Sequence, residues 1–220
     1  MTATHRIATL TFADLFGKKT ALNSRELKKL HALGEPVRFR LGESIIAEGE
    51  VANDVYGLSR GVVRIYKTFP DGQRCILRFA LPGEFLELPH GKYHSVSAAA
   101  IGSVSLSRFQ KAEFVEFVRS SRNMTRSMMD IAANDLKHAQ DHMLIVGKAA
   151  PEEKIIAFIK TWRKHFPRGI EKHVSLPMPR RDIAAHLGMA PETVTRVFAA
   201  LEQKKVVRVV ADGIELLNGQ

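Results

Sequence analysis

The segment Arg180–Glu202, with the sequence RRDIAAHLGMAPETVTRVFAALE, decides how the C-terminal part of the chain folds. Gly188-Met189-Ala190 is a short turn that contains glycine, as a helix-turn-helix requires. Pro191 suits the first position of a second helix, because its missing N–H would have no partner there. The apolar residues on both sides have the spacing that buries one face of each of two short helices: Ile183, Leu187, Val194, Val197, Phe198 and Leu201. The segment therefore predicts a helix-turn-helix.

The second predicted helix carries polar side chains near its N-terminus, on the face opposite the apolar residues. A carboxylate, two hydroxyls and a guanidinium in this position are groups that reach base edges in a major groove. The alternative interpretation is an ordinary helical hairpin with a solvated charged face. We favour DNA recognition by the outward positions, which are Glu192, Thr193, Thr195, Arg196 and Ala199.

The sequence on either side of this segment completes a small domain. A helix is predicted from Glu152 to His165 and a short strand from Val174 to Leu176. After the helix-turn-helix, Val206–Val210 and Ile214–Leu217 are predicted strands joined by a tight turn at Asp212-Gly213. A hairpin directly behind a recognition helix indicates the wing of a winged helix-turn-helix.

The N-terminal half has a different pattern. Residues 1–34 favour helix, and from Pro36 to about Arg108 short apolar runs alternate with glycine-containing turns. Pro70-Asp71-Gly72 is a strong hairpin signal, and Gly42-Glu43 and Gly61 are further predicted turns. Many short strands at this spacing indicate a β-sandwich or roll; the predicted strands are 37–41, 55–58, 62–66 and 75–79.

A long helix is predicted between these two regions, from about Asn123 to Val146. Its apolar residues recur at intervals of four and three, which is the seam of a two-stranded coiled coil: Ala132, Leu136, Ala139, Met143 and Val146. The alternative is a helix packed on its own domain. The segment 147–151 breaks the pattern and is the predicted hinge, so we expect domains at 1–120 and 148–220 joined by a dimerisation helix at 121–147.

Composition restricts the function classes. The chain has 33 Lys+Arg against 23 Asp+Glu, a formal net charge of +10, which favours polyanionic partners. No apolar run approaches the length of a membrane span, and the N-terminus lacks a signal-peptide pattern, so we expect a cytoplasmic protein with no membrane partner. A single cysteine, Cys75, excludes an internal disulfide and an all-cysteine metal site. No catalytic triad, phosphate loop or paired carboxylates stand out, so no catalytic residue and no enzyme activity are expected.

The complete order is an α+β arrangement: an N-terminal β-roll, a long dimerisation helix and a C-terminal winged helix-turn-helix. It resembles the Crp/Fnr superfamily of bacterial transcription regulators over nearly the full chain. The glycine pattern of the cyclic-nucleotide-binding-like jelly roll in that family is matched at Gly42-Glu43, Glu48-Gly49-Glu50, Gly61 and Pro82-Gly83-Glu84-Phe85. Glu192-x-x-Thr195-Arg196 looks like the E-x-x-S-R reading motif of the Fnr and FixK branch, with threonine in place of serine.

The resemblance implies a homodimeric activator that reads a palindrome of the TTGA…TCAA type and contacts RNA polymerase. Glu192, Thr195 and Arg196 are then the expected base contacts. The exposed loops at 70–72 and 165–173 are candidates for the polymerase contact. The expected phosphate contacts, which position the protein without specifying sequence, are Arg180, Arg181, Thr193, Lys204, Lys205 and Arg208.

The resemblance also indicates which effectors are absent. Members that respond to cyclic AMP hold it with a Gly-Glu pair, an Arg-Ser pair and two hydroxyls on the dimer helix. The positions that align here are Glu87, His94, Ser95, Ala139 and Gln140. The phosphate-binding arginine is replaced by His94, so the bidentate fork for an anionic phosphate is missing and cyclic AMP is not the expected signal. The cysteine cluster of oxygen-sensing Fnr is absent too, and Leu81–Phe85 followed by His94–Ala98 looks like the FixK-type subgroup.

No cofactor and no metal site are therefore expected, and two alternatives stay open. In the first, the roll binds haem or another small molecule through His90, His94 or Cys75 and gates the same regulator. We interpret the histidines instead as loop or rim residues, and Cys75 as a buried inert thiol. The second alternative, a non-transcriptional cyclic-nucleotide-binding module, would have no need of the motif at Glu192–Arg196.

Overall fold

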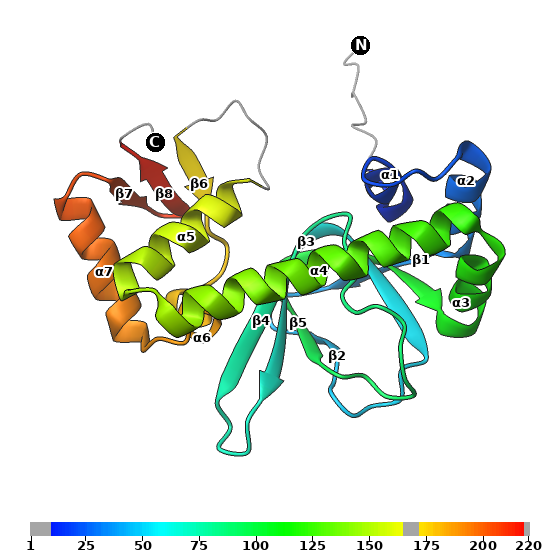
Figure 1. The fold of residues 1–220 in the computed structure, drawn as a ribbon, viewed down its shortest axis with the longest axis horizontal. Coiled ribbons are helices and arrows are strands. Elements are labelled where there is room, and N and C mark those ends of the chain that lie inside the picture. The colour runs from blue at the N-terminus through cyan, green and yellow to red at the C-terminus, as the bar shows by residue number, and fades with distance from the viewer. Residues whose placement is uncertain (1–9, 165–171, 218–220) are drawn as a thin grey trace, which may run out of the picture. The chain divides into compact units, whose positions relative to one another are not determined.

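The computed structural model describes residues 10–164 and 172–217 of the chain (Figure 1). Contacts divide it into two compact units, Met1–Val63 with Ala80–Ala132 and Arg64–Phe79 with Ala133–Gln220. The elements are α1 Phe12–Gly17, α2 Ser24–Leu33, β1 Glu35–Phe39, β2 Ser44–Ile46, β3 Asp54–Thr68, β4 Arg74–Ala80, β5 Ser97–Gln110, α3 Lys111–Ser120, α4 Arg122–Lys148, α5 Pro151–Arg163, β6 His173–Ser175, α6 Arg180–Leu187, α7 Pro191–Gln203, β7 Val207–Val210 and β8 Gly213–Leu216.

The strands of the N-terminal half form one sheet in the order β1-β5-β3-β4, with β2 also paired to β5. β1 runs antiparallel to β5, from the pair Glu35–Arg108 to the pair Phe39–Val104. The predicted β-roll with its α+β organisation is therefore confirmed, and the turn at 70–72 joins β3 to β4 as expected.

The predicted turn at Gly61 is wrong. The separate strands expected at 55–58 and 62–66 are one continuous strand, β3, and Gly61 lies inside it. Gly61 has φ of +91°, and a β-carbon there would lie 2.6 Å from the carbonyl oxygen of Ser103. Glycine is thus required because the backbone of β5 comes close, not because the chain reverses.

Aromatic side chains build the core of the first unit. Phe12 and Phe16 of α1 meet Phe85 and Phe109, with ring centroids between 4.8 and 5.8 Å apart for the contacts of Phe12. α1 starts in a capping box, in which Thr11 caps the helix and Asp14 accepts from the Thr11 N–H. These contacts close one end of the roll with the helices that the sequence predicts in residues 1–34.

The long helix is present as predicted and extends slightly further than expected. α4 runs from Arg122 to Lys148, so Gly147 and Lys148 of the predicted hinge are still helical and the break lies at Ala149-Ala150. α5 begins at Pro151, which occupies the first helical turn. Every residue from Ala132 to Asp141 is exposed in the single chain, so no part of the chain that the structure describes covers this stretch of α4.

The second unit contains α5, α6, α7 and a sheet in the order β6-β8-β7 (Figure 1). The pattern that predicted the helix-turn-helix is buried as expected, with Val197 only half-buried. β7 and β8 form the predicted wing, in register from Val207–Leu216 to Val210–Gly213. Gly213 has no room for a side chain, because a β-carbon would meet the carbonyl oxygen of Val174 on β6. The winged helix-turn-helix is therefore confirmed.

Candidate DNA-binding interface

The turn between α6 and α7 has the geometry of a helix-turn-helix. Gly188 ends α6 in the left-handed region, with φ of +61°, and its N–H donates to the carbonyl oxygen of Ala184. Only glycine adopts this conformation without a steric penalty from its side chain. Three residues later Pro191 opens α7. The local sequence thus sets the angle at which the second helix leaves the first.

The first two turns of α7 present the predicted base-contacting side chains to solvent. Glu192, Thr195 and Arg196 are all exposed, while Val194 between them is buried. Nη2 of Arg196 donates to Oγ1 of Thr193 at 3.2 Å. The side chain that restrains Arg196 in the structure is therefore Thr193. The side chains of Glu192, Thr195 and Arg196 form one polar face at the N-terminal end of α7.

The side chains predicted to contact phosphates differ in how they are engaged. Arg181 is exposed, with its Nε 3.9 Å from a carboxylate oxygen of Asp182. The guanidinium of Arg180 lies over the Phe198 ring, with Cζ 3.5 Å from the ring centroid, and burial lowers its pKa. Arg180 therefore packs on the core of the domain through the Phe198 ring, whereas the side chain of Arg181 extends into solvent.

Two of the remaining candidates pair with carboxylates of the same unit. Nζ of Lys204 donates to both oxygens of Glu152, at 2.7 and 2.9 Å. Arg208 on β7 donates to Glu215 on β8 at 3.1 Å. Lys205 is exposed at the end of α7, in the left-handed region with φ of +55°. Nothing in the sequence pattern pointed to Glu152, which is 52 residues away from Lys204.

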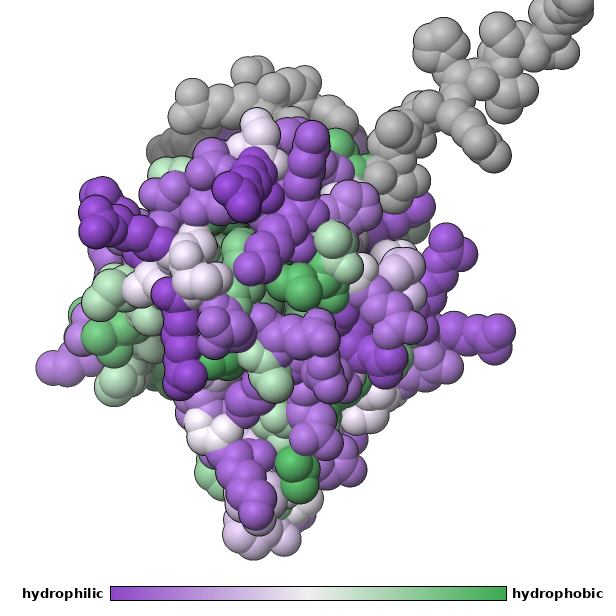
Figure 2. Space-filling model, turned by 90° about the vertical axis from the view of Figure 1, so that its right-hand side faces the viewer, coloured by the Kyte–Doolittle hydropathy of each residue, from purple (hydrophilic) through white to green (hydrophobic). Residues whose placement is uncertain are grey.

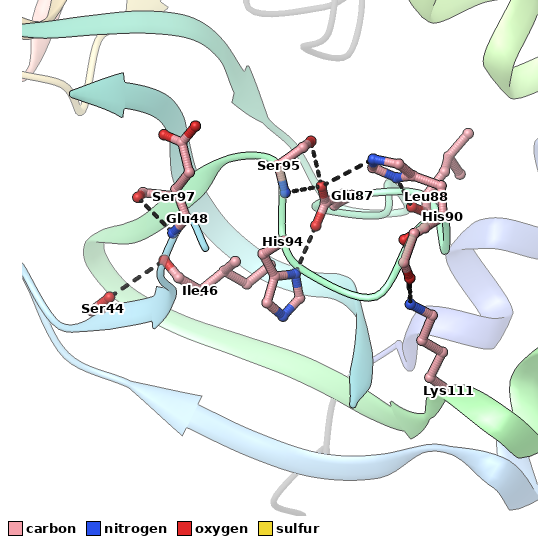
Figure 3. Close-up of polar contacts among 11 residues, drawn as sticks. Ser44, Ile46, Glu48, Glu87, Leu88, His90, His94, Ser95, Ser97 and Lys111 are labelled. Carbon is pink, nitrogen blue, oxygen red and sulfur yellow. Dashed lines mark hydrogen bonds and ion pairs between the residues drawn. The ribbon is translucent and has the colours of Figure 1, made fainter. Parts of the chain in front are cut away.

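In the β-roll the predicted effector residues Glu87, His94 and Ser95 come together (Figure 3). One carboxylate oxygen of Glu87 accepts from the N–H and Oγ of Ser95, at 2.9 and 2.6 Å. The other lies 2.7 Å from Nδ1 of His94. Burial alone would raise the pKa of Glu87, but the hydrogen bonds from Ser95 and His94 outweigh it and hold the pKa below its usual value. Glu87 is therefore an ionised acceptor for its neighbours.

His94 lies in a loop ahead of β5, as the sequence suggested, but its side chain is only 10% exposed, so it is not a rim residue. The cavity beside it has a volume of about 10 Å³, space for about one water molecule. His90 is exposed and bonds the carbonyl oxygen of Leu88. The last two effector candidates, Ala139 and Gln140, are exposed on α4 in the other compact unit.

Several further expectations concern the rest of the described chain. Cys75 is half-buried on β4, so the prediction of a buried thiol was only partly right. Residues 10–164 and 172–217 contain no group of three or more His, Cys, Asp or Glu side chains able to hold a metal ion. No helix in these ranges is both long and apolar enough to cross a membrane.

The face drawn in Figure 2 is mostly hydrophilic, with apolar residues in small separate patches. Of the predicted polymerase loop at 165–173, residues 165–171 lie outside the described residues.

Comparison with known proteins agrees with this architecture. Residues 36–121 match the model of the cyclic nucleotide-binding domain, and residues 153–220 match that of the Crp-like helix-turn-helix domain. The transcriptional activatory protein AadR of Rhodopseudomonas palustris is 41% identical over 199 residues, covering 90% of this chain and 83% of that protein. The nitrogen fixation regulation protein FixK of Bradyrhizobium diazoefficiens is 38% identical over 201 residues, covering 90% and 85%.

A solved structure shows the same arrangement. FixK2 from Bradyrhizobium japonicum is 30% identical, and the match covers 84% of this chain and 92% of that one with a TM-score of 0.78. No family of enzymes appears among these relatives, which are transcription regulators. The chain belongs to the Crp/Fnr family of DNA-binding transcription regulators, in its FixK-like branch.

Proposed function

We propose that this regulator is a homodimeric activator that reads a TTGA…TCAA-like palindrome without cyclic AMP. The observation that carries the proposal is the exposed polar face of α7 formed by Glu192, Thr195 and Arg196. Arg196 can contact O6 and N7 of a guanine, Glu192 can accept from a cytosine amino group, and the methyl group of Thr195 can meet a thymine methyl. Together these contacts read the G·C and T·A pairs of such a half-site.

The dimer is supported by the exposed apolar residues of α4. Leu136 and Met143 are 61% and 67% exposed and stand seven residues apart. Seven residues is the repeat of a two-stranded coiled coil, and large apolar side chains in a row are rarely left in water. A second copy of the same helix is the proposed occupant. The paired α4 helices would place two copies of α7 in successive major grooves, one helical turn apart.

Independence from cyclic AMP is supported by the contacts of Glu87. Its two oxygens already accept from His94 and Ser95, and the cavity that Glu87 and His94 line has space for only about one water molecule. His94 at the position of the phosphate-binding arginine cannot supply a bidentate fork. We propose that the protein acts with no bound cofactor, haem included.

The other partners follow from the same function. We propose that the protein acts in the cytoplasm, where it would meet the DNA that it regulates. An activator also needs a contact to RNA polymerase, and the tip of the β3–β4 hairpin is the candidate in the described chain. Phe69, next to the turn at 70–72, is 56% exposed there, which suits a protein contact.

The test is DNA binding by the purified protein with no ligand added. A labelled duplex with TTGA…TCAA and a scrambled duplex are titrated at the same fixed salt concentration, since affinities depend steeply on salt. We expect binding to the palindrome that is at least a hundredfold tighter, together with a dimer in sedimentation. Weak and equal binding would contradict the proposal. If selective binding then appeared only with a small molecule, or if the protein showed a Soret band, a ligand-gated regulator would replace it.

A further inference from the structure

Helix α6 is attached at two points to the outer half of the β3–β4 hairpin, Arg64–Phe79, which belongs to the same compact unit. Nη1 of Arg64 on β3 donates to Oδ2 of Asp182 at 3.0 Å. Nδ1 of His186 donates to the carbonyl oxygen of Ile76 on β4, also at 3.0 Å. Positions 182 and 186 share one face of the helix, because they are four residues apart. Both strands of the hairpin therefore hold the same face of α6.

The first of these contacts is a buried ion pair. The side chains of Arg64 and Asp182 are 12% and 9% exposed, and Nε of Arg64 is buried without a hydrogen-bond partner in the structure. An exposed ion pair contributes little and tolerates many geometries. A buried pair is different, since separating its charges leaves each one uncompensated. The pair therefore selects one arrangement of α6 on the hairpin.

Aromatic packing supplies the rest of this contact. The ring of Phe79 on β4 meets Trp162 of α5 edge-on, with centroids 5.8 Å apart, and His186 of α6 at 5.3 Å. Such packing is attractive but has little directional preference beyond the edge-on geometry. The apolar contact thus holds the surfaces together, and the Arg64–Asp182 pair decides their orientation.

We infer that Arg64 and Asp182 are positioning residues for DNA reading, which hold α6 and α7 in the orientation that engages the operator. α7 packs directly on α6, so a rotation of α6 on the hairpin moves the polar face of α7 with it. The two recognition helices of a dimer must reach grooves one helical turn apart, and a small rotation in each copy misplaces both. The inference rests on base reading by α7, and it assigns a role to residues that touch no DNA.

The experiment compares variants of the full chain on the palindromic and scrambled duplexes. Arg64→Met and Asp182→Asn each break the ion pair, and the double variant removes both charges. Arg74→Met is the matched control, because Arg74 lies exposed on the same hairpin, over the Tyr66 ring, and its loss changes the net charge equally. Trp162 is the single tryptophan of the chain, so acrylamide quenching of its fluorescence reports whether the hairpin stays in place.

We expect each single variant to bind the palindrome at least tenfold more weakly than the wild type, while its affinity for the scrambled duplex stays within twofold of the wild type. Trp162 should become more accessible to the quencher, and the circular dichroism spectrum should not change. The double variant should lose no more than the singles, because they remove one shared interaction. Palindrome binding equal to that of Arg74→Met would overturn the inference. So would a lower melting temperature with unchanged binding, which would mark a merely structural pair. If Arg64→Met does not fold, Arg64→Gln, which keeps a polar side chain but removes the charge, is judged by the same criteria.

The wild-type measurement separates this inference from the proposed function. If the wild-type protein does not prefer the palindrome, the proposed half-site is wrong. The variants are then compared on a site selected from random duplexes, where the same tenfold criterion applies to the ion pair.

Discussion

At the scale of single residues, Arg196 is the proposed base contact with the most specific chemistry. It is exposed on α7, and its hydrogen bond to Thr193 restrains the guanidinium before DNA is bound. A guanidinium has five N–H donors, so the bond to Thr193 leaves donors for a guanine. Restraint of this kind reduces the side-chain entropy that binding would otherwise cost.

Replacement of Arg196 by alanine should therefore affect one base pair of each half-site. We expect Arg196→Ala to lose about 1–3 kcal/mol of specific binding per half-site and to relax discrimination at the guanine. Titrations of wild-type and substituted duplexes at one salt concentration measure this. Arg181→Ala, which removes an exposed arginine one helix earlier, should instead weaken all duplexes alike. An equal loss for Arg196→Ala on specific and scrambled DNA would show that Arg196 contacts phosphate.

His186 predicts a pH dependence of stability. Burial, and then the nearby His142, lower the pKa of His186 from 6.5 to about 4, despite the bond to the Ile76 carbonyl. Above pH 6.5 the ring is neutral in both folded and unfolded chains. Between pH 6.5 and 4 the unfolded chain binds the proton first, so the free energy of unfolding falls as the pH falls.

Thermal melting of the wild type at several pH values should show this loss, and His186→Gln, which keeps a hydrogen-bond donor, should show less of it. The comparison is made between pH 7.5 and 4.0. If both proteins lose the same stability over this range, His186 is not the group responsible.

At the scale of elements, α4 carries the proposed dimer interface. The predicted seam is exposed at Ala132, Leu136, Ala139 and Met143 in the single chain and half-buried at Val146. The alternative of a helix packed on its own domain does not describe residues 132–141, all of which are exposed. The earlier turns of the helix do pack inward, with Met124 fully buried. The helix is therefore buried in its own unit at its start and exposed further along, where we propose the dimer contact.

A charge placed in the seam should separate the dimer. We expect Leu136→Glu to be monomeric at micromolar concentration in analytical ultracentrifugation and to lose selective binding of the palindrome, because two carboxylates would face each other across an apolar contact. Asn134→Glu adds the same charge away from the seam and should stay dimeric. A dimeric Leu136→Glu protein would place the dimer contact elsewhere.

At the scale of the whole molecule, a net charge of +10 favours DNA of any sequence. Part of that charge is already neutralised next to the interface, since Lys204 pairs with Glu152 and Arg208 with Glu215. Exposed pairs of this kind are worth only about 0.2–1 kcal/mol, so a phosphate can compete for these cations. We therefore expect these carboxylates to moderate non-specific binding without preventing it.

The salt dependence of binding tests this balance. We expect Lys204→Ala to weaken binding to specific and scrambled DNA alike and to reduce the slope of log K against log salt by about one. Glu152→Gln, which frees Lys204, should strengthen both. An unchanged slope in Lys204→Ala would remove Lys204 from the phosphate contacts.

The sequence by itself determined the elements whose signals are local. The helix-turn-helix, the wing and α4 follow from apolar periods, Pro191 and Gly188, because those residues act within one or two turns of backbone. The motif formed by Glu192, Thr195 and Arg196 indicated the family, because it resembles the reading motif of the Fnr and FixK branch. Strand boundaries were less determined, since Gly61 signals a close neighbour as easily as a turn.

Only the tertiary structure decided which distant side chains meet. Arg64 and Asp182 are 118 residues apart, and Lys204 and Glu152 are 52 apart. Glu87 and His94 were both named from the sequence, but not their hydrogen bond or the burial of His94. Such pairs depend on how whole elements pack, and a single sequence carries no period or spacing that records them. The reading helix was therefore predictable, whereas the contacts that orient it were not.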